Sequence, residues 1–285
     1  MESYWFYLVL IASISHALWN IMLKQSDDKA VFLWSLRIWS VIIFLPISIL
    51  LWPSGVTITY EWIFWGLGSI VLHSAYAIIL SKAYEKSDFS LAYPISRGLG
   101  PLIVVATGTL LLSEPISYLS VAGSILIFIG IYIMYSGLSF SIGLRSLKSM
   151  IKSPYPLLVG LLIASYTLFD KLAISVIPPV SLNVIENLGQ VLVLGILQVR
   201  NIGVVSRQWK SNWFKMAIAG GLAGLSYILV LIVLTEVPVS LVAPVRESSI
   251  VICSLLGVYL LKEKFNFNKI IGSLIIFTGV VFIVW

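Results

Sequence analysis

Residues 90–101 read Ser-Leu-Ala-Tyr-Pro-Ile-Ser-Arg-Gly-Leu-Gly-Pro and place an arginine, Arg97, in a run otherwise apolar enough to cross a bilayer. An arginine at the centre of a membrane helix costs roughly 2.5–3.5 kcal/mol on insertion scales, so such residues usually face a functional cavity. A near copy, Ser-Leu-Val-Ala-Pro-Val-Arg-Glu-Ser-Ser, occupies residues 240–249. The two stretches predict a membrane protein built around a pair of arginines, Arg97 and Arg246.

The composition indicates the class of protein. Of the 285 residues, 59% are hydrophobic and 11% are charged, and the mean hydropathy is +1.03; soluble domains have about 25% charged residues. The net charge of +6 does not indicate a nucleic-acid partner, because the basic residues lie in short gaps between apolar runs, where they orient a membrane protein. A single cysteine, Cys253, and two histidines far apart give no disulfide and no recognisable zinc spacing. We expect an integral membrane protein without a cofactor or metal.

Ten apolar runs approach the ~20 residues that a membrane-spanning helix needs. They are continuous, which is typical of helices, whereas the strands of outer-membrane barrels alternate. The first run lacks a basic leader and a cleavage site, so we expect it to be retained as a helix. The runs lie at about 4–23, 31–52, 60–82, 89–112, 117–136, 154–176, 180–199, 213–234, 239–261 and 267–285.

The chain repeats itself with a shift of about 150 residues. We therefore expect residues 1–136 and 154–285 to form two five-helix halves, joined by a linker at 137–153. Five is an odd number, so the second half enters the membrane from the opposite face, which is the inverted repeat of many transporters. The matched pairs include Ser90 with Ser240, Pro94 with Pro244, Arg97 with Arg246, Glu114 with Glu263, Gly123 with Gly272, and Gly130 with Gly279.

The connections between the helices differ sharply in charge. Fourteen of the 18 Lys and Arg residues lie in or beside the first, third, fifth, seventh and ninth connections, and the others hold none. We expect a multi-pass protein of the cell (inner) membrane. The positive-inside rule predicts that its odd-numbered loops are cytoplasmic and that both termini are on the outer side.

This arrangement resembles the EamA family of the drug/metabolite transporter superfamily: two five-helix halves, each with a proline-bearing fourth helix and Leu-Leu-x-Glu before the fifth. The resemblance covers both halves. It implies export or exchange of small metabolites, amino acids or drugs through a central cavity lined by the first, third, fourth, sixth, eighth and ninth helices. Residues 16–20, 92–98, 166–170 and 245–249 are similar to motifs of a bacterial subgroup, some members of which are labelled as associated with phosphonate use.

The two arginines are the strongest candidates for substrate binding. Counted along their helices, Arg97 and Arg246 lie within about 10 Å of each other in depth, one on either side of the midplane. Guanidinium groups bind carboxylate, phosphate or phosphonate in a bidentate manner. The alternative is internal pairing with Glu247, Glu186 or Asp170, which would only fix helix packing.

The other polar positions of the apolar runs complete the predicted site. Pro94 and Pro244 each remove a helix hydrogen bond and are candidates for gating, or else static kinks. Asp170 and Glu186 are candidates for proton coupling, since low dielectric favours the neutral form of a carboxylic acid, and Glu247 for an ammonium group or a proton. The remaining candidates for the pocket are His16, Trp19, Asn20, His73, Tyr76, Tyr93 and Tyr166, although the two histidines are equally well explained as hydrogen-bonded packing residues.

Several residues have plain structural explanations. Arg37 is close enough to a helix end to reach the cytoplasmic headgroups, although a contact with substrate explains it equally well, and Lys171 is expected to pair with Glu186. Glu114 and Glu263 precede the fifth and tenth helices, where a carboxylate offsets the N-terminal dipole. Paired glycines at spacings of four and seven predict close helix packing.

These observations predict a secondary transporter of a small anionic or zwitterionic metabolite, such as an amino acid, organic acid or phosphonate. The sequence contains no nucleophile with a base and no phosphate-binding Gly-rich loop, so neither enzyme activity nor ATP-driven transport is expected. The expected partners are the substrate, the bilayer and coupling protons, with the chain acting as a monomer or homodimer. Two alternatives stay open, namely an exporter of lipophilic cations, and a membrane scaffold or lipid-handling protein.

Overall fold

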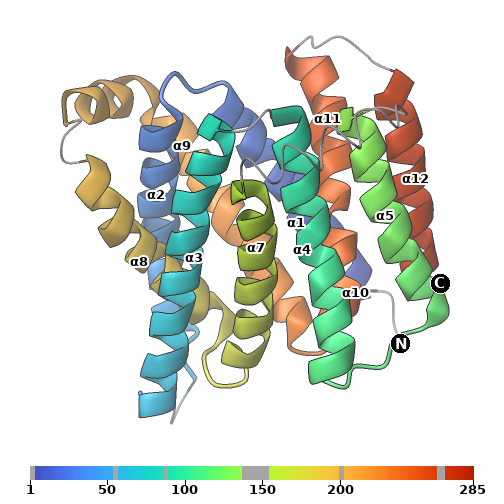
Figure 1. Ribbon diagram of the computed structural model, residues 1–285. Coiled ribbons are helices and arrows are strands. Elements are labelled where there is room, and N and C mark those ends of the chain that lie inside the picture. The colour runs from blue at the N-terminus through green and yellow to red at the C-terminus, as the bar shows by residue number, and fades with distance from the viewer. Residues whose placement is uncertain (1–3, 54–56, 87–88, 137–153, 199–201, 262–266) are drawn as a thin grey trace.

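The computed structural model describes residues 4–53, 57–86, 89–136, 154–198, 202–261 and 267–285. Within these ranges the side chains of residues 84–86 and 89–95, and of a few further positions, are not described. Every regular element of the described chain is a helix, and most of the helices run side by side along one direction (Figure 1). They are α1 (Tyr4–Lys24), α2 (Lys29–Leu50), α3 (Tyr60–Lys86), α4 (Phe89–Leu111), α5 (Tyr118–Ser136), α7 (Tyr155–Ala173), α8 (Pro179–Gln198), α9 (Ile202–Leu234), α10 (Val239–Arg246), α11 (Ser248–Leu261) and α12 (Phe267–Val284).

The apolar runs of the sequence become these helices, with bounds that agree within a few residues at most ends. Eight of the described helical segments are long and apolar enough to cross a membrane, and 96–111 and 118–134 form shorter apolar helices. The molecule is therefore a multi-pass membrane protein. One bound was wrong: α9 begins at Ile202 rather than near residue 213, because a polar segment continues the helix beyond its apolar part.

The expected single helix at 239–261 is divided into α10 and α11, with Glu247 between them. The division follows Pro244, which has no N–H to donate. Hydrogen bonds at this point span three residues rather than four: the Glu247 N–H donates to the Pro244 carbonyl (3.0 Å), and the Ile250 N–H donates to the Glu247 carbonyl (2.9 Å). The interruption lies directly beside Arg246.

The halves pack on each other in corresponding pairs. Helix α1 packs on α9, and its counterpart α7 packs on α3. Helix α2 packs on α9 as α8 packs on α3, and α4 packs on α7 as α11 packs on α1. Two further large contacts join counterparts directly, α2 with α8 and α5 with α12, whereas α4 with α5 is a large contact within the first half. Every central helix therefore contacts the other half of the chain.

The predicted glycine packing is confirmed between α5 and α12, which lie next to each other at one side of the molecule (Figure 1). A Cβ on Gly123 would lie 2.4 Å from the Gly279 carbonyl oxygen, and a Cβ on Gly130 would lie 2.7 Å from that of Gly272. The reciprocal distances, 2.5 and 2.6 Å, are almost the same. Only glycine permits this approach of two backbones.

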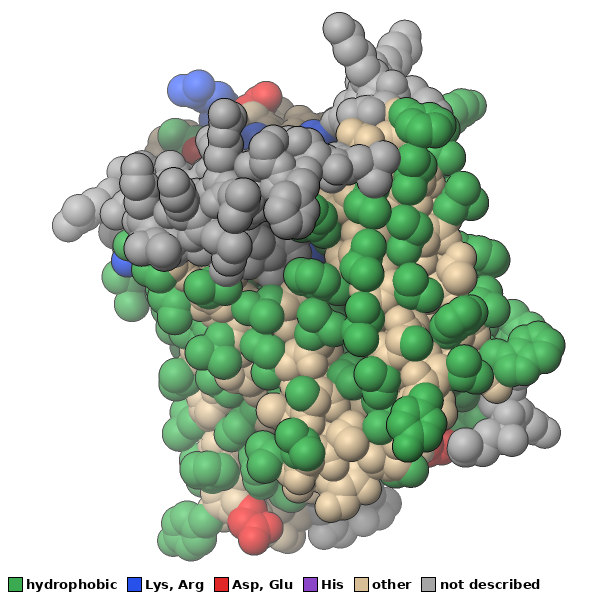
Figure 2. Space-filling model, turned by 45° about the vertical axis from the view of Figure 1, so that its right-hand side comes forward, with side chains coloured by type: hydrophobic (Ala, Val, Ile, Leu, Met, Phe, Trp, Pro, Cys, Tyr) green, Lys and Arg blue, Asp and Glu red, His purple; other side chains and the backbone are tan. Residues whose placement is uncertain are grey.

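The surface has the character expected of a chain in lipid. Figure 2 shows an almost continuous cover of hydrophobic side chains along the described helices of this face, with Lys and Arg only towards its upper end. Large exposed apolar residues include Leu192, Ile196 and Phe277, at 71%, 74% and 66% exposure. Such exposure is unfavourable in water and favourable in a bilayer.

Candidate functional site

Charged and polar side chains meet in the interior, and they form two neighbouring groups. The arginine cluster consists of His16, Arg97, Arg246 and Glu247, from α1, α4, α10 and the α10–α11 connection. The carboxylate cluster consists of His73, Asp170, Glu186 and Tyr227, from α3, α7, α8 and α9. The described arginine, carboxylate and His73 side chains of these clusters are almost completely buried, none exposing more than 9%.

Arg97 has an internal carboxylate partner. Its Nε lies 3.2 Å from Oε2 of Glu247, which is fully buried. Its Nη2 lies 3.4 Å from Nε2 of His16. The expected pairing of one arginine with Glu247 is thus present, and the pair joins the two halves of the chain.

Arg246 has different surroundings. Its Nη2 donates to the hydroxyl oxygen of Tyr166 at 3.5 Å, and its backbone carbonyl accepts from the Ser13 hydroxyl (3.3 Å). Within the described part of the chain, no carboxylate oxygen lies within 4.0 Å of its guanidinium nitrogens. The side chain is nevertheless 93% buried, since only 7% of the residue is exposed. A buried guanidinium with a neutral contact has capacity for an anion.

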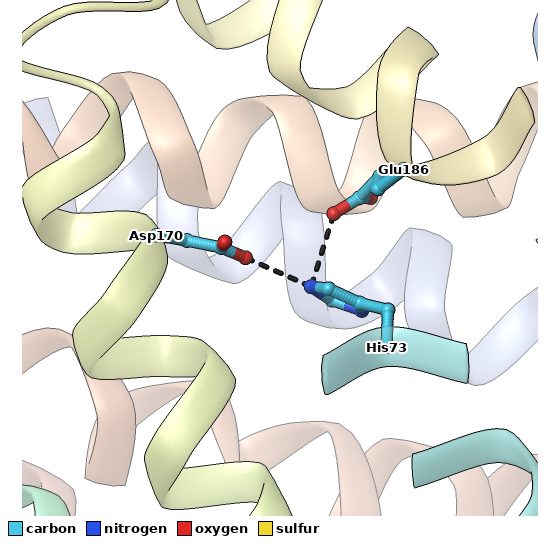
Figure 3. Close-up of side chains that lie close together, drawn as sticks. All are labelled: His73, Asp170 and Glu186. Carbon is cyan, nitrogen blue, oxygen red and sulfur yellow. Dashed lines mark hydrogen bonds and ion pairs between the residues drawn. The ribbon is translucent and has the colours of Figure 1, made fainter. Parts of the chain in front are cut away.

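The carboxylate cluster brings two acids to one ring nitrogen (Figure 3). Nε2 of His73 lies 2.8 Å from Oδ2 of Asp170 and 3.0 Å from Oε2 of Glu186. Both carboxyl groups point towards the imidazole from helices on opposite sides of it. Like charges repel at this separation, so a proton or small cation shared by the three groups is favourable. Their ligand atoms all lie within 4.8 Å of one another, so these three side chains could together hold a metal ion.

Further polar groups hold the two acids in place. The Tyr227 hydroxyl donates to Oδ2 of Asp170, and Nδ2 of Asn183 donates to Oε1 of Glu186 at 3.1 Å. Oδ1 of Asp170 makes no hydrogen bond within the described chain although it is buried. The cluster therefore has acceptor capacity left over.

Tyr166 connects the two clusters. Its ring lies 4.3 Å from the His73 ring, centroid to centroid, and its hydroxyl accepts from Arg246. The ring of Tyr76 packs against it edge-on at 5.4 Å. A ligand with one acidic and one basic end would find groups of opposite charge on the two sides of this tyrosine.

The other predicted site residues lie at or beyond the edge of this network. The Trp19 ring packs edge-on against His16 at 5.1 Å and belongs to the apolar contact of α1 with α2 and α9. The Asn20 amide donates to the His16 carbonyl (2.7 Å) on its own helix. The side chains of Tyr93 and Pro94 lie outside the described residues.

One residue takes part that the sequence did not single out for the site. Tyr227 was not selected, although a tyrosine in the middle of an apolar helix was a usable signal. Of the two explanations for Arg37, the structure does not support the headgroup contact: its Nη1 lies 3.2 Å from the Asn187 amide oxygen, next to the carboxylate cluster. The expected pairing of Lys171 with Glu186 is wrong, because Lys171 donates to the carbonyls of Leu234 and Val237.

Comparisons with known proteins place this architecture. The model of the EamA-like transporter family matches residues 154–285. Twenty-eight chains of solved structures are similar. One of these, a crystal structure of a protein with 15% sequence identity, superimposes with a TM-score of 0.70 over 98% of this chain and 95% of that chain, which shows a common fold. The comparison with curated proteins gives no match. The match of its second half, residues 154–285, supports placing this chain in the EamA-like transporter family of the drug/metabolite transporter superfamily.

Proposed function

We propose that this protein is a secondary transporter of a small anionic or zwitterionic metabolite, and that Arg246 anchors the acid group of the substrate. One observation carries the proposal: Arg97 is neutralised by Glu247 at 3.2 Å, whereas Arg246 has only the Tyr166 hydroxyl as a described side-chain contact. A desolvated arginine is costly unless an anion compensates it. The substrate supplies that anion.

The carboxylate cluster accounts for the second end of a zwitterion. Asp170 and Glu186 offer acceptor oxygens beside the rings of Tyr166 and Tyr227, and aromatic faces attract cations. An amino acid or an aminophosphonate carries an acid and an ammonium group at suitable ends. In the absence of substrate, Asp170 and Glu186 hold the coupling proton.

Transport proceeds by alternating access between two inverted five-helix repeats in the inner membrane. The corresponding packing pairs of the halves and the reciprocal contacts of the α5 and α12 glycines support this architecture. The buried clusters lie where the repeats meet, which is the usual place of a transporter site. Pro94 and Pro244 act in gating, and the α10–α11 division beside Arg246 supports this for Pro244.

The proposal is tested first by ligand binding. A thermal-shift screen of the purified protein against amino acids, organic acids and phosphonates identifies a ligand, and titration calorimetry then measures its dissociation constant. Arg246→Gln is expected to weaken binding of an acidic ligand at least about tenfold, because a charge-assisted contact contributes about 1.5–3 kcal/mol. Glu247→Gln is expected to strengthen binding, because it frees Arg97 from its internal anion. Arg207→Gln, at an exposed arginine of α9, is the matched control and leaves binding unchanged.

Other outcomes would identify the two alternative functions. Retained binding of lipophilic cations by the double variant Arg97→Ala, Arg246→Ala, without binding of any acid, would favour a cation exporter. Absence of saturable uptake of every screened compound in proteoliposomes, together with tolerance of both arginine substitutions, would favour a scaffold or lipid-handling protein.

A further inference from the structure

The connection between α4 and α5 directs one carboxylate into the other half of the chain. Oε1 of Glu114 accepts a hydrogen bond from the Val239 N–H at 2.8 Å, and Oε2 accepts from the Ser240 N–H at 3.0 Å. These residues open α10, which has Pro238 at its N-cap and no cap from its own side chains. Glu114 therefore supplies the cap that α10 lacks.

The sequence-based expectation for Glu114 named the wrong helix. The residue was expected to offset the dipole of the helix that follows it, α5. That helix is capped by Ser117, whose Oγ accepts from the Ser120 N–H at 3.0 Å. The carboxylate of Glu114 is thus free to act between the halves.

The local backbone holds Glu114 in this position. Ser113 adopts a left-handed conformation, with φ at 53°, which is rare for a residue other than glycine. The Glu114 N–H donates to the carbonyl of Gly108 (3.1 Å). A Cβ on Gly108 would lie 2.8 Å from Oε2 of Glu114, so a side chain there would displace the carboxylate.

A lysine binds the other side of the same connection. Nζ of Lys171, on α7, donates to the carbonyls of Leu234 and Val237 at the end of α9. Glu114 and Lys171 thus bind the two ends of the α9–α10 connection with opposite charges, each suited to its helix terminus. An open groove of about 350 Å³ reaches both residues. It is lined by Leu112, Glu114, Lys171, Leu172, Glu236 and Pro238.

The cap acts on the substrate site through a short helix. Helix α10 has eight residues and ends at Arg246, about 12 Å from its start at 1.5 Å per residue. The division after Arg246 separates it from α11, so α10 is a short element held at its first turn by Glu114. Whatever fixes Val239 and Ser240 also fixes the depth and direction of Arg246.

We propose that Glu114 is a positioning residue whose hydrogen bonds to α10 are reversible. They hold the start of α10 against the first half of the chain, and they break when the site opens at this end. The proposal rests on the alternating access proposed above. Its chemistry suits a reversible contact: the carboxylate is only half-buried beside an open groove, so water can replace both hydrogen bonds. The glycine contacts of α5 with α12 involve no such exchangeable groups.

A cysteine reporter at Ser240 measures this release. Ser240 is fully buried, and its Oγ has no hydrogen-bond partner in the described chain, so Ser240→Cys removes no contact. In a Cys253→Ser background, purified protein is treated with a water-soluble maleimide and the rate of labelling is followed by mass spectrometry. Glu114→Gln is expected to raise the rate about tenfold. Gly108→Ala, which displaces the carboxylate while keeping its charge, is expected to raise it as well.

The matched control is Glu236→Gln. This exposed carboxylate lies on the same connection and bonds to the Tyr4 hydroxyl rather than to a helix terminus, so its loss should leave the rate unchanged. Labelling of both Glu114→Gln and Gly108→Ala at the parent rate, with native elution on gel filtration, would overturn the proposal. If Glu114→Gln does not fold, the labelling rate of Gly108→Ala alone tests the proposal. If labelling is faster but Arg246→Gln binds ligand normally, the proposed role of Glu114 stands and the proposed binding of the substrate's acid group by Arg246 is wrong.

Discussion

Two arginines at matching positions of the repeat have different partners, and the residues next to them explain why. Glu247 follows Arg246, whereas the matching position after Arg97 is Gly98. A Cβ on Gly98 would lie 2.5 Å from the Phe128 ring, which leaves no room for a second carboxylate. The arginine cluster therefore has one glutamate for its two arginines, and that glutamate binds the arginine of the other half. This asymmetry leaves Arg246 without a carboxylate partner among the described residues, which supports its proposed role in binding a substrate.

Proton coupling through the carboxylate cluster is testable at Asp170. In Asp170→Asn the amide cannot take up and release the proton that the acid shares with His73, 2.8 Å away. We expect the variant to lose accumulation of substrate driven by a pH gradient in proteoliposomes while retaining substrate exchange without a gradient. Asp27→Asn, at an exposed acid of the α1–α2 connection, should behave as the parent. Undiminished accumulation by Asp170→Asn would exclude this residue as the coupling group.

The sequence selected most members of the two clusters but could not predict how they are grouped. Polar residues in apolar runs were enough to select Arg97, His73, Asp170 and Glu186, because burying them in a membrane demands a reason. That His73 faces Asp170, 97 positions away, depends on how α3 and α7 pack, and no local pattern encodes it. Tyr227 was missed for the same reason, since its hydroxyl matters only through its contact with Asp170.

At the scale of the helices, prediction was accurate wherever bilayer thickness sets the length of an element. Most helix ends follow from the need for about 20 apolar residues. The prediction of helix bounds was inaccurate where something other than bilayer thickness sets the length of the helix. The polar start of α9 at Ile202 needs no apolar run, and the division after Arg246 depends on hydrogen bonding around Pro244. Both exceptions lie on helices that border the site.

The packing of α5 on α12 predicts a large effect from a small substitution. In Gly130→Ala the new Cβ would lie 2.7 Å from the Gly272 carbonyl oxygen and 2.9 Å from the Ile276 nitrogen, both backbone atoms that cannot rotate away. Overpacking of this kind costs about 1–3 kcal/mol. We expect a lower thermal unfolding temperature for the purified protein.

The control for this substitution is Gly203→Ala at the start of α9. Among the described residues, no heavy atom beyond its neighbours in the helix lies within 4 Å of a Cβ built there, and alanine favours a helix over glycine, so stability should be unchanged or slightly higher. If Gly130→Ala unfolded at the parent temperature, the close contact of α5 with α12 would be wrong.

At the scale of the whole molecule, the two ends differ in the charged residues that they carry. The end that carries Glu114 also carries Glu236, at the same groove, and the start of α1 reaches it through Tyr4. The opposite end carries the polar first part of α9 with Arg207 and Lys210. By the positive-inside rule, we expect the basic end to face the cytoplasm. In that orientation, the proposed contact of Glu114 with α10 would control access from outside, and the linker at 137–153, which lies outside the described residues, is expected on the cytoplasmic side.

This orientation is tested at the two ends of one helix. Ser206 and Thr235 are both exposed, near the start and just past the end of α9, and each is replaced by cysteine in a Cys253→Ser background. We expect a membrane-impermeant maleimide to label Thr235→Cys in intact cells and Ser206→Cys only in inside-out vesicles, because basic loops are retained in the cytoplasm. The Cys253→Ser protein alone should take no label. The reverse pattern would mean that the opposite orientation is correct and that Glu114 lies at the cytoplasmic end. Equal labelling of both positions in intact cells would mean that the chain inserts in two orientations.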